Sequence, residues 1–585
     1  MSSRLWLALG VISLVIFAIS TYLLVHRNGL ELLWGYLPLF QFSSFWFGLI
    51  AISCRKWQLD DPKTRYLGLS TLTALLLSFG FPPFPFPVLL MVGFVPLLWI
   101  SNQIGTTSSR PAWSLFFYCF HGFLLWNIWT TYWVANTAYA AGIFANVVNA
   151  MLMTIPILLY YLVTSRLGRS VGLVAFCCFW LAFEFLHMRW ELYWPWLTLG
   201  NGLSTMPRGI QWFEYTGVLG GSLWILSANY LLFDFLSKTE KSKGRLLSLA
   251  VALIAPVAIS LIVAVGVQES GQEVNVVLVQ PNFEPHYEKF HIPDEILVQR
   301  FLSLAEEKVD EHTDYLIFPE TSFGRVDMDG LKGHNVMLDL QSFLAQYPDL
   351  NIVTGLAGYR WLTDRSEQEL ATSRRLLNSE GQTTYVETYN CAIQMDFDGR
   401  ISEYYKALFV PGAEFFPFRR ILFFLKPLVD KLGGTIAGYR TRSKHNVFAA
   451  GDVIAAPAIC YESIFGEFMS RFIRKQANVI FIMTNDGWWD NTAGHKQHAL
   501  FARLRAIELR RGIARSANMG TCCFIDQKGT IYNPTEYGIE QSISGIVQTN
   551  DEVTFYASWG DFIGRISLFV AGLLLLRSLV HRFTK

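Results

Sequence analysis

The sequence predicts a polytopic α-helical membrane domain joined to a layered, water-soluble α/β domain. The 585 residues are 52% hydrophobic and only 16% charged, whereas soluble domains average about 25% charged residues. The apolar excess is uneven, because residues 1–267 and 562–581 are strongly hydrophobic while residues 273–555 have an ordinary soluble composition. The net charge is +1, so no broad basic field points to a nucleic-acid partner.

Ten apolar blocks approach the length of roughly 20 residues that a helix needs to cross a bilayer. The blocks are Leu5–Val25, Leu32–Ser53, Leu67–Gly80, Val88–Ile100, Trp113–Trp133, Val147–Val163, Val171–Leu186, Gly220–Leu236, Leu246–Val267 and Ile563–Val580. A proline-rich stretch at residues 81–87 separates the short third and fourth blocks. Because proline ends helices, we expect two helices joined by a tight turn there.

The loop charges predict how these helices are oriented, since Lys and Arg accumulate on the cytoplasmic side of a membrane. One set of alternating loop ends carries fifteen Lys and Arg residues, whereas the opposite short loops carry only Arg27, Arg189 and Arg208. We therefore expect both termini to be cytoplasmic. The soluble domain between the ninth and tenth spans then faces the other side.

Within residues 273–555, β-rich runs alternate with helical patterns, which predicts a layered α/β domain. The expected strands are Val274–Val279, Tyr315–Phe318, Ile352–Thr354, Cys391–Met395, Val453–Ile459 and Val479–Thr484. The expected helices are Asp294–Asp310, His334–Tyr347, Glu462–Lys475 and Ala499–Arg510.

Three reactive side chains follow strands of this domain, where ligands of α/β folds usually bind. They are Glu320, Lys406 and Cys460. A carboxylate, an amine and a thiol suit nucleophilic acyl transfer, with the carboxylate as base and the ammonium stabilising an oxyanion. Taken singly, Cys460 fits a core position better than a nucleophile, because a lone cysteine after an apolar strand is more often a core residue. Glu320 is also compatible with a helix cap, and Lys406 with a solvated loop.

Other polar groups point to no metal and no cofactor. The eight cysteines form no CxxC pair, and His495 and His498 have no further ligands at zinc spacing, so we interpret both histidines as structural. The stretch from Arg503 to Arg515 is rich in charge, which favours a salt-bridged surface helix. We expect Cys460 to be a free thiol.

The sequence motifs around these three residues resemble the catalytic boxes of the carbon–nitrogen hydrolase, or nitrilase, superfamily. The boxes are IFPETS at Ile317–Ser322, YYKALFVPGAEFFP at Tyr404–Pro417 and AICYESIFGE at Ala458–Glu467. This resemblance implies an αββα sandwich in which Glu320 is the general base, Lys406 stabilises the oxyanion and Cys460 is the nucleophile.

The membrane frame is similar to one branch of that superfamily, the apolipoprotein N-acyltransferases. The similarity covers most of residues 66–580 and includes Val277–Phe290, Arg189–Leu203 and Thr484–Gly529. It implies that an acyl chain passes from a membrane phospholipid, through a cysteine thioester, to the N-terminal amine of a diacylglyceryl-cysteine lipoprotein. It also implies a bacterial inner membrane location, with the catalytic domain in the periplasm.

The resemblance extends to supporting and substrate-binding residues. Glu414 and Glu462 are expected to orient Lys406, and the backbone N–H of Tyr461 to face the oxyanion. Aromatic side chains expected near the substrate are Trp194, Trp196, Trp488, Trp489 and Phe290. For Trp194 and Trp196, a membrane-interface belt is an equal alternative. Phe290 replaces a tryptophan of the family, and Gly412-Ala413 departs from its usual Phe-Gly.

These observations divide the chain into four parts. Residues 1–56 form an extra pair of transmembrane helices, 66–267 the transmembrane domain, 273–555 the nitrilase-like catalytic domain and 562–581 a final transmembrane helix. Two alternatives stay open at this point. A membrane-anchored amidase or nitrilase would hydrolyse a small amide with the same three residues, and a membrane scaffold would have no activity.

Overall fold

The computed structural model describes residues 2–238, 242–269, 271–368, 372–377, 383–418, 438–442 and 445–584. It divides into two compact units. The first comprises Met1–Gly266, Thr492–Leu500 and Asp561–Lys585, and the second comprises Val267–Asn491 and Phe501–Gly560.

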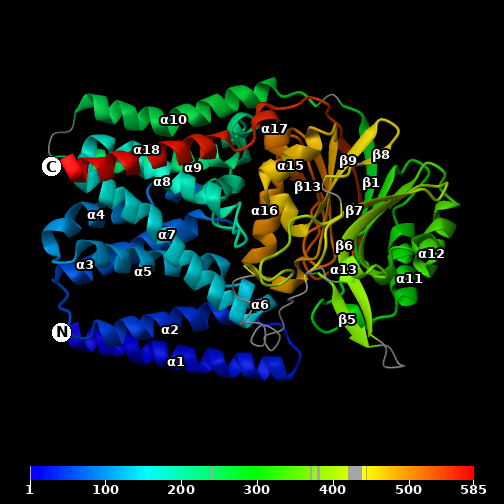
Figure 1. The fold of residues 1–585 in the computed structure, drawn as a ribbon, viewed down its shortest axis with the longest axis horizontal. Helices are drawn as coiled ribbons and strands as arrows, with labels where there is room; N and C mark the ends of the chain where they lie inside the picture. The colour runs from blue at the N-terminus through cyan, green and yellow to red at the C-terminus, as the bar shows by residue number, and fades with distance from the viewer. Residues whose placement is uncertain are drawn as a thin grey trace. The chain divides into compact units, whose positions relative to one another are not determined.

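The first unit is helical throughout its described part, and its long helices run alongside one another with both chain ends at the same end of the unit (Figure 1). The α-helices are α1 (Ser2–Gly29), α2 (Leu37–Ser53), α3 (Pro62–Gly80), α4 (Val95–Thr107), α5 (Pro111–Thr131), α6 (Val134–Thr137), α7 (Tyr139–Leu167), α8 (Gly172–His187), α9 (Phe213–Ser237), α10 (Lys243–Gly266) and α18 (Phe562–Thr584). Short 3₁₀ turns are η1 (Pro87–Met91), η2 (Arg169–Val171), η3 (Leu199–Thr205) and η4 (Pro207–Gly209).

Every apolar block of the sequence overlaps one of these helices. Among the described residues, seven helical segments are long and apolar enough to cross a membrane, and α2 is a shorter apolar helix. The helices α3 and α5, of 19 and 21 residues, are not among these seven. This composition identifies a membrane protein.

The N-terminal pair α1 and α2 is joined to the other helices by hydrogen bonds between buried or half-buried polar groups. Trp46 Nε1 on α2 donates to His121 Nδ1 on α5 at 3.0 Å, and Tyr139 OH on α7 donates to Gln41 Oε1 at 2.6 Å. Because polar groups find no water in a bilayer, such bonds favour one docking position. The extra pair therefore packs as part of the first unit.

The second unit is a sandwich of two sheets. The strands of the first sheet are β1 (Glu273–Gln280), β2 (Tyr315–Ile317), β3 (Phe323–Asp327), β4 (Asn351–Trp361), β5 (Arg374–Leu377), β6 (Thr383–Met395), β7 (Ile401–Tyr405) and β14 (Gln541–Gln548). The strands of the second are β8 (Phe448–Ala450), β9 (Val453–Ile459), β10 (Val479–Thr484), β11 (Gly512–Ala517), β12 (Cys523–Ile525) and β13 (Ile531–Tyr532). The inner faces meet at the rings of Tyr315 and Phe481, whose centroids are 4.9 Å apart.

Helices cover both sheets, with α15 and the Phe501–Leu509 part of α16 on one side of the strands and α11 and α12 on the other (Figure 1). The helical segments are η5 (Lys289–His291), α11 (Asp294–Glu306), η6 (Leu331–Gly333), α12 (Asn335–Leu344), α13 (Arg365–Gln368), η8 (Cys460–Ile464), α15 (Gly466–Ile473), η9 (Asp486–Trp489), α17 (Phe555–Trp559) and the second half of α16 (Ala493–Leu509), whose first half belongs to the first unit. The expected αββα order of layers is confirmed.

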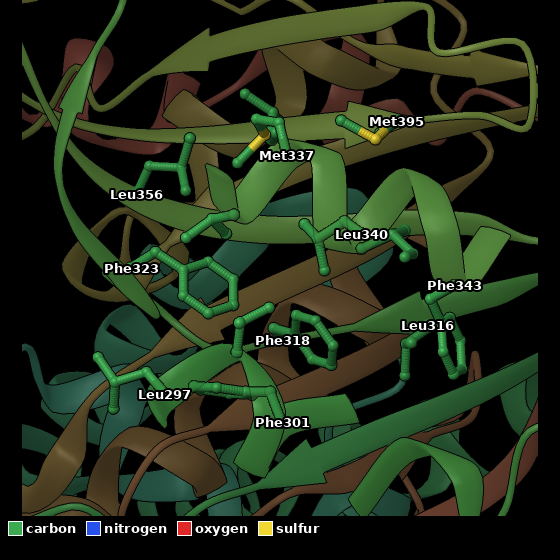
Figure 2. Close-up of a cluster of buried hydrophobic side chains, with 14 of the residues drawn as sticks. Leu297, Phe301, Leu316, Phe318, Phe323, Met337, Leu340, Phe343, Leu356 and Met395 are labelled. Atoms are coloured by element: carbon green, nitrogen blue, oxygen red, sulfur yellow. The ribbon is translucent and has the colours of Figure 1, made fainter. Parts of the chain in front are cut away.

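A continuous apolar core holds the first sheet against its two helices. Figure 2 shows Phe343 of α12 beside Leu316 of β2, with Leu297 and Phe301 of α11 in the same apolar cluster. The Phe301 ring packs against that of Phe318, with centroids 4.9 Å apart. Phe301 and Leu316 are fully buried. Burial of such side chains contributes about 1.5–3 kcal/mol each, so this layer is a firm support for the loops that leave β2.

Several expected elements are correct in kind but wrong in extent. The runs at Ile352–Thr354 and Cys391–Met395 are only parts of β4 and β6, which form a long antiparallel pair. The expected helix Glu462–Lys475 is η8 followed by α15. The first half of β6 contains several polar residues, which interrupt the apolar pattern, so the sequence predicted only the later part of the strand.

Candidate active site

Glu320 lies in a tight turn directly after β2. Thr321 has a left-handed backbone, with φ of +48°, and the turn is held by two bonds to Gly355 of β4. Gly355 N donates to Pro319 O at 3.1 Å, and Ser322 N donates to Gly355 O at 2.8 Å. A Cβ at Gly355 would lie only 2.6 Å from Pro319 O, so glycine is required for this close approach.

Lys406 follows β7 and is the centre of a buried charge cluster. Its side chain is 1% exposed, and its Nζ donates to Glu320 Oε1 at 3.0 Å and to Glu414 Oε1 at 2.7 Å. Burial alone would lower the pKa of Lys406, but the carboxylates of Glu320 and Glu414 raise this pKa well above its ordinary value. The amine is therefore a fixed ammonium.

Glu414 is positioned by the loop that departs from the family pattern. Val410 N donates to Glu414 Oε2 at 2.7 Å, and Glu414 N donates to Val410 O at 2.9 Å. Gly412, inside this turn, has a φ of +84°, a conformation that favours glycine. The substituted loop thus presents the glutamate to Lys406.

Asn390, which sequence reasoning missed, joins the two carboxylates. Its Nδ2 donates to Glu320 Oε1 at 2.8 Å and to Glu414 Oε1 at 3.2 Å. Asn390 lies in β6, directly opposite the start of the Lys406 loop, since Lys406 N donates to Asn390 O at 2.9 Å. The signal in the sequence was a single asparagine inside a β-rich run, where asparagine is depleted.

Cys460 ends β9 and begins η8. Its backbone is left-handed, with φ of +50°, and the residue is 6% exposed. Burial, followed by the charge of Glu320, raises the pKa of the Cys460 thiol well above its ordinary value, although Lys406 opposes this effect. The resting sulfur therefore carries its proton and needs a base before it can attack. No disulfide joins any of the eight cysteines, all of which lie in the described part of the chain.

Glu462 holds the backbone on both sides of the site. Its Oε1 accepts hydrogen bonds from Ala407 N at 2.6 Å and Tyr404 OH at 2.7 Å, and its Oε2 accepts from Ile459 N at 2.8 Å. Burial raises the pKa of Glu462 to about 7. Glu462 thus fixes the loop after Lys406 through main-chain groups, whereas Glu414 contacts the ammonium directly.

Tyr461 lies between Cys460 and Glu462 and is 2% exposed. Its ring packs edge-on against Phe465, with centroids 5.2 Å apart. The assignment of its backbone N–H to an oxyanion stays a prediction.

A second buried charge pair lies behind Cys460. Arg515 donates to Asp486 at 2.6 Å, and both side chains are fully buried. Asp486 also accepts a hydrogen bond from the Thr484 hydroxyl at 2.8 Å, and Thr484 hydrogen-bonds with the Cys460 thiol. Sequence reasoning missed this path from the end of β10 to the sulfur.

The interpretation of the Arg503–Arg515 stretch as a surface helix is wrong. Arg505 is fully buried, with its Nε donating to Glu508 Oε2 at 2.7 Å, and Arg511 is 1% exposed, with its Nε donating to Ala477 O at 2.9 Å. These guanidinium groups satisfy backbone carbonyls inside the fold, as buried charge requires. They are part of the support of the second sheet.

The expected aromatic residues are divided between the units. Trp488 and Trp489 lie in η9 of the second unit, and the Trp488 ring is 5.0 Å from the His286 ring. Trp194 and Trp196 belong to the first unit, where Trp196 packs edge-on against Trp133 at 4.7 Å. Phe290 lies in η5, and its side chain lies outside the part of the chain that is described.

The arrangement is suited to acyl chemistry at a thiol. It combines a carboxylate, an ammonium held by two carboxylates, and a buried protonated cysteine at a strand end. No group of three or more His, Cys, Asp or Glu side chains within the described ranges has the arrangement of a metal site. His498 instead packs edge-on against Trp196 within the first unit, with centroids 5.9 Å apart.

Two family models match the chain. The apolipoprotein N-acyltransferase N-terminal domain matches residues 73–231, and the carbon–nitrogen hydrolase model matches residues 278–569. The two matched segments correspond to the helical region and the sandwich.

Two relatives align with most of this chain and with most of their own length. The apolipoprotein N-acyltransferase of Chlorobaculum tepidum is 27% identical over 88% of this chain and 96% of its own length. That of Geobacter metallireducens is 24% identical over 86% of this chain and 92% of its own. Among solved structures, Saccharomyces cerevisiae Nit3, a member of branch 10 of the nitrilase superfamily, aligns with 48% of this chain and 92% of its own, at 15% identity and a TM-score of 0.34.

Proposed function

This chain belongs to the apolipoprotein N-acyltransferase family, a membrane branch of the carbon–nitrogen hydrolases, and from that premise we propose how Glu320, Lys406 and Cys460 perform the reaction. The protein is an acyltransferase of lipoprotein maturation, with a lipid donor and a lipoprotein acceptor. The observation that carries the mechanism is the Lys406 ammonium held by Glu320 and Glu414 in the same buried site as the Cys460 thiol.

The first half-reaction forms a thioester. Glu320 takes the proton from the Cys460 sulfur, and the thiolate attacks the ester carbonyl of a phospholipid. The Lys406 ammonium and the backbone N–H of Tyr461 stabilise the oxyanion that develops. The carbon–oxygen bond to the glycerol then breaks, Glu320 gives its proton to that oxygen, and a lysophospholipid leaves.

The second half-reaction uses the same groups in reverse order. The α-amine of a diacylglyceryl-cysteine at a lipoprotein N-terminus attacks the thioester carbonyl, with Glu320 accepting the amine proton. The carbon–sulfur bond breaks, the proton returns to Cys460, and an amide is formed. Because the resting thiol is kept protonated by burial, the free enzyme is restored without a further reactant.

The charge pattern of the loops supports an orientation for the reaction. Both chain ends lie at one end of the helical unit (Figure 1), as expected if the Lys- and Arg-rich loop ends and both termini are cytoplasmic. We assign the sandwich to the periplasmic side of a bacterial inner membrane. Trp488 and Trp489 then serve as walls for the acyl chain, and Trp194 and Trp196 as membrane-proximal contacts.

A reconstitution experiment tests this function. The purified protein in vesicles would receive a phospholipid with an isotope-labelled acyl chain and a peptide that begins with diacylglyceryl-cysteine. We expect the peptide mass to rise by one labelled acyl chain with the native protein and with Cys178→Ala, but not with Cys460→Ala. Release of labelled free fatty acid without peptide acylation would contradict the transferase and favour a hydrolase.

A further inference from the structure

Lys289 is a buried lysine beside the turn that carries Glu320. It lies in η5 and is 2% exposed. Its Nζ donates to the backbone carbonyl of Glu320 at 3.0 Å and to Thr321 Oγ1 at 3.3 Å. The sequence resemblance drew attention to the neighbouring Phe290 and gave no role to this amine.

The segment that carries Lys289 is itself fixed on two sides. Lys289 N donates to Glu284 O at 2.9 Å, which closes a turn between the two residues. Nearer β1, Asn518 Nδ2 donates to Phe283 O at 2.7 Å, and Phe283 N donates to Asn518 Oδ1 at 3.2 Å. The ammonium is therefore held at the Glu320 turn by a loop that follows β1 and is anchored to Asn518, the residue after β11.

The Glu320 turn has a conformation that needs such support. Thr321 adopts a φ of +48°. This left-handed conformation is strained for a β-branched residue such as threonine. Gly355 holds the turn through Pro319 and Ser322. Lys289 holds the intervening peptide carbonyl, while Lys406 and Asn390 hold the Glu320 carboxylate. The backbone carbonyl and the side-chain carboxylate of Glu320 are thus both held by lysine or asparagine donors.

Lys289 also balances charge. Glu320 and Glu414 bring two carboxylates to Lys406, and Lys289 supplies a second ammonium near Glu320. Burial lowers the pKa of Lys289 to about 8, and the charge of Glu320 opposes this shift. At any pH below the ordinary pKa of lysine, a buried amine with a lowered pKa reduces the stability of the folded protein. Its burial is therefore better explained by the reaction than by stability.

We propose that Lys289 is a positioning residue for the general base, and this inference rests on the proposed function. Its ammonium fixes the turn that carries Glu320 through charge-assisted hydrogen bonds to the Glu320 carbonyl and the Thr321 hydroxyl, and it places a positive charge near the Glu320 side chain. Lys289 acts through Glu320 and forms no bond to the substrate.

Three substitutions separate the charge of Lys289 from its shape. Lys289→Met removes the charge and the donors, Lys289→Gln keeps a donor without charge, and Lys289→Arg keeps the charge. Lys308→Met is the matched control, because Lys308 is an exposed lysine of the same unit. The rate of thioester formation would be measured by intact mass across phospholipid concentrations, and each variant would be melted in the same detergent.

We expect Lys289→Met and Lys289→Gln to lower the maximal rate of thioester formation by roughly 100-fold. The half-saturating phospholipid concentration and the melting temperature should stay near their native values. Lys289→Arg should keep at least about a tenth of the native rate, and Lys308→Met all of it. Native rates in Lys289→Met, equal losses in the Arg and Gln variants, or melting well below the native protein would each overturn the proposal.

A lipid-free measurement distinguishes failure of this inference from failure of the proposed function. Alkylation of Cys460 by iodoacetamide needs removal of the same thiol proton but no phospholipid. We expect alkylation in Lys289→Met to be slower than in the native protein by a factor similar to that for thioester formation. Equal alkylation rates would overturn the role of Lys289, whether or not a thioester forms.

Discussion

Glu414 lies closer to the Lys406 ammonium than Glu320, the proposed general base, does. Its Oε1 accepts a hydrogen bond from Lys406 Nζ at 2.7 Å, compared with 3.0 Å for Glu320 Oε1. A second carboxylate thus shares the cation, and Asn390 donates to both acids. Glu320, Lys406, Glu414 and Asn390 thus form a four-residue hydrogen-bonded cluster, which extends beyond the three residues proposed to do the chemistry.

Removing the charge of Glu414 tests this arrangement. Glu414→Gln keeps the shape of the side chain but takes one of the two charged partners from Lys406. Hydrogen bonds to charged groups contribute about 1.5–3 kcal/mol, so we expect thioester formation to slow by roughly 10- to 100-fold. The control is Glu311→Gln, because the Glu311 side chain is 86% exposed. An unchanged rate in Glu414→Gln would remove Glu414 from the mechanism.

Asn390 allows a graded test of the same cluster. Asn390→Ala removes two donors from the carboxylates, and we expect a loss of about 10-fold in the rate of thioester formation. Asn390→Asp adds a third carboxylate beside Glu320 and Glu414, and like charges at this distance favour protonation. We therefore expect the Asp variant to be much slower than the Ala variant, as measured by intact mass. The reverse order would contradict the hydrogen-bond assignment.

The raised pKa of Glu462 predicts a pH-dependent stability. Because this pKa is raised from 4.5 to about 7 in the folded protein, the stabilising effect is complete below about pH 4.5 and is lost as the pH rises through about 7. The shift corresponds to roughly 3 kcal/mol. We expect the native protein to melt at a lower temperature at about pH 8 than at about pH 5, and Glu462→Gln to reduce this difference. A difference of the same size in Glu462→Gln would show that another group is responsible.

The buried pair of Arg515 and Asp486 predicts a paired effect on stability. Arg515→Met leaves the Asp486 carboxylate without its 2.6 Å partner, and breaking a buried pair from one side costs about 3–5 kcal/mol. The double variant Arg515→Met with Asp486→Asn removes both charges, so we expect it to melt closer to the native protein than the single variant does. Thermal melting of the three proteins measures this. A double variant less stable than Arg515→Met would contradict the pairing.

The sequence predicted strands where the physical signal was local. The runs VIAAPAI and VIFIMT are continuous apolar strands in the second sheet, and their limits match β9 and β10 residue by residue. Glu320 and Cys460 were singled out because they follow such strands, and the roles proposed for them rest on the resemblance to the family. Such strands are buried on both faces, so each position carries the same signal.

The sequence did not predict contacts that depend on pairing between distant segments. Asn390 reaches Glu320 only because β6 pairs with β4, and Lys289 reaches the same residue from a loop 31 positions away. From the sequence, Arg505 and Arg515 were expected at the surface, because charged side chains usually are exposed. Only the fold reveals the carbonyls and carboxylates that satisfy them.

The account depends most directly on a thioester at Cys460. The measurement is the intact mass of the native protein, Cys460→Ala and Cys178→Ala after incubation with phospholipid, followed by hydroxylamine. We predict a mass increase of one acyl chain, released by hydroxylamine, in the native and Cys178→Ala proteins and absent from Cys460→Ala. A folded native protein that acquires no acyl chain, or a Cys460→Ala protein that does, would contradict the mechanism.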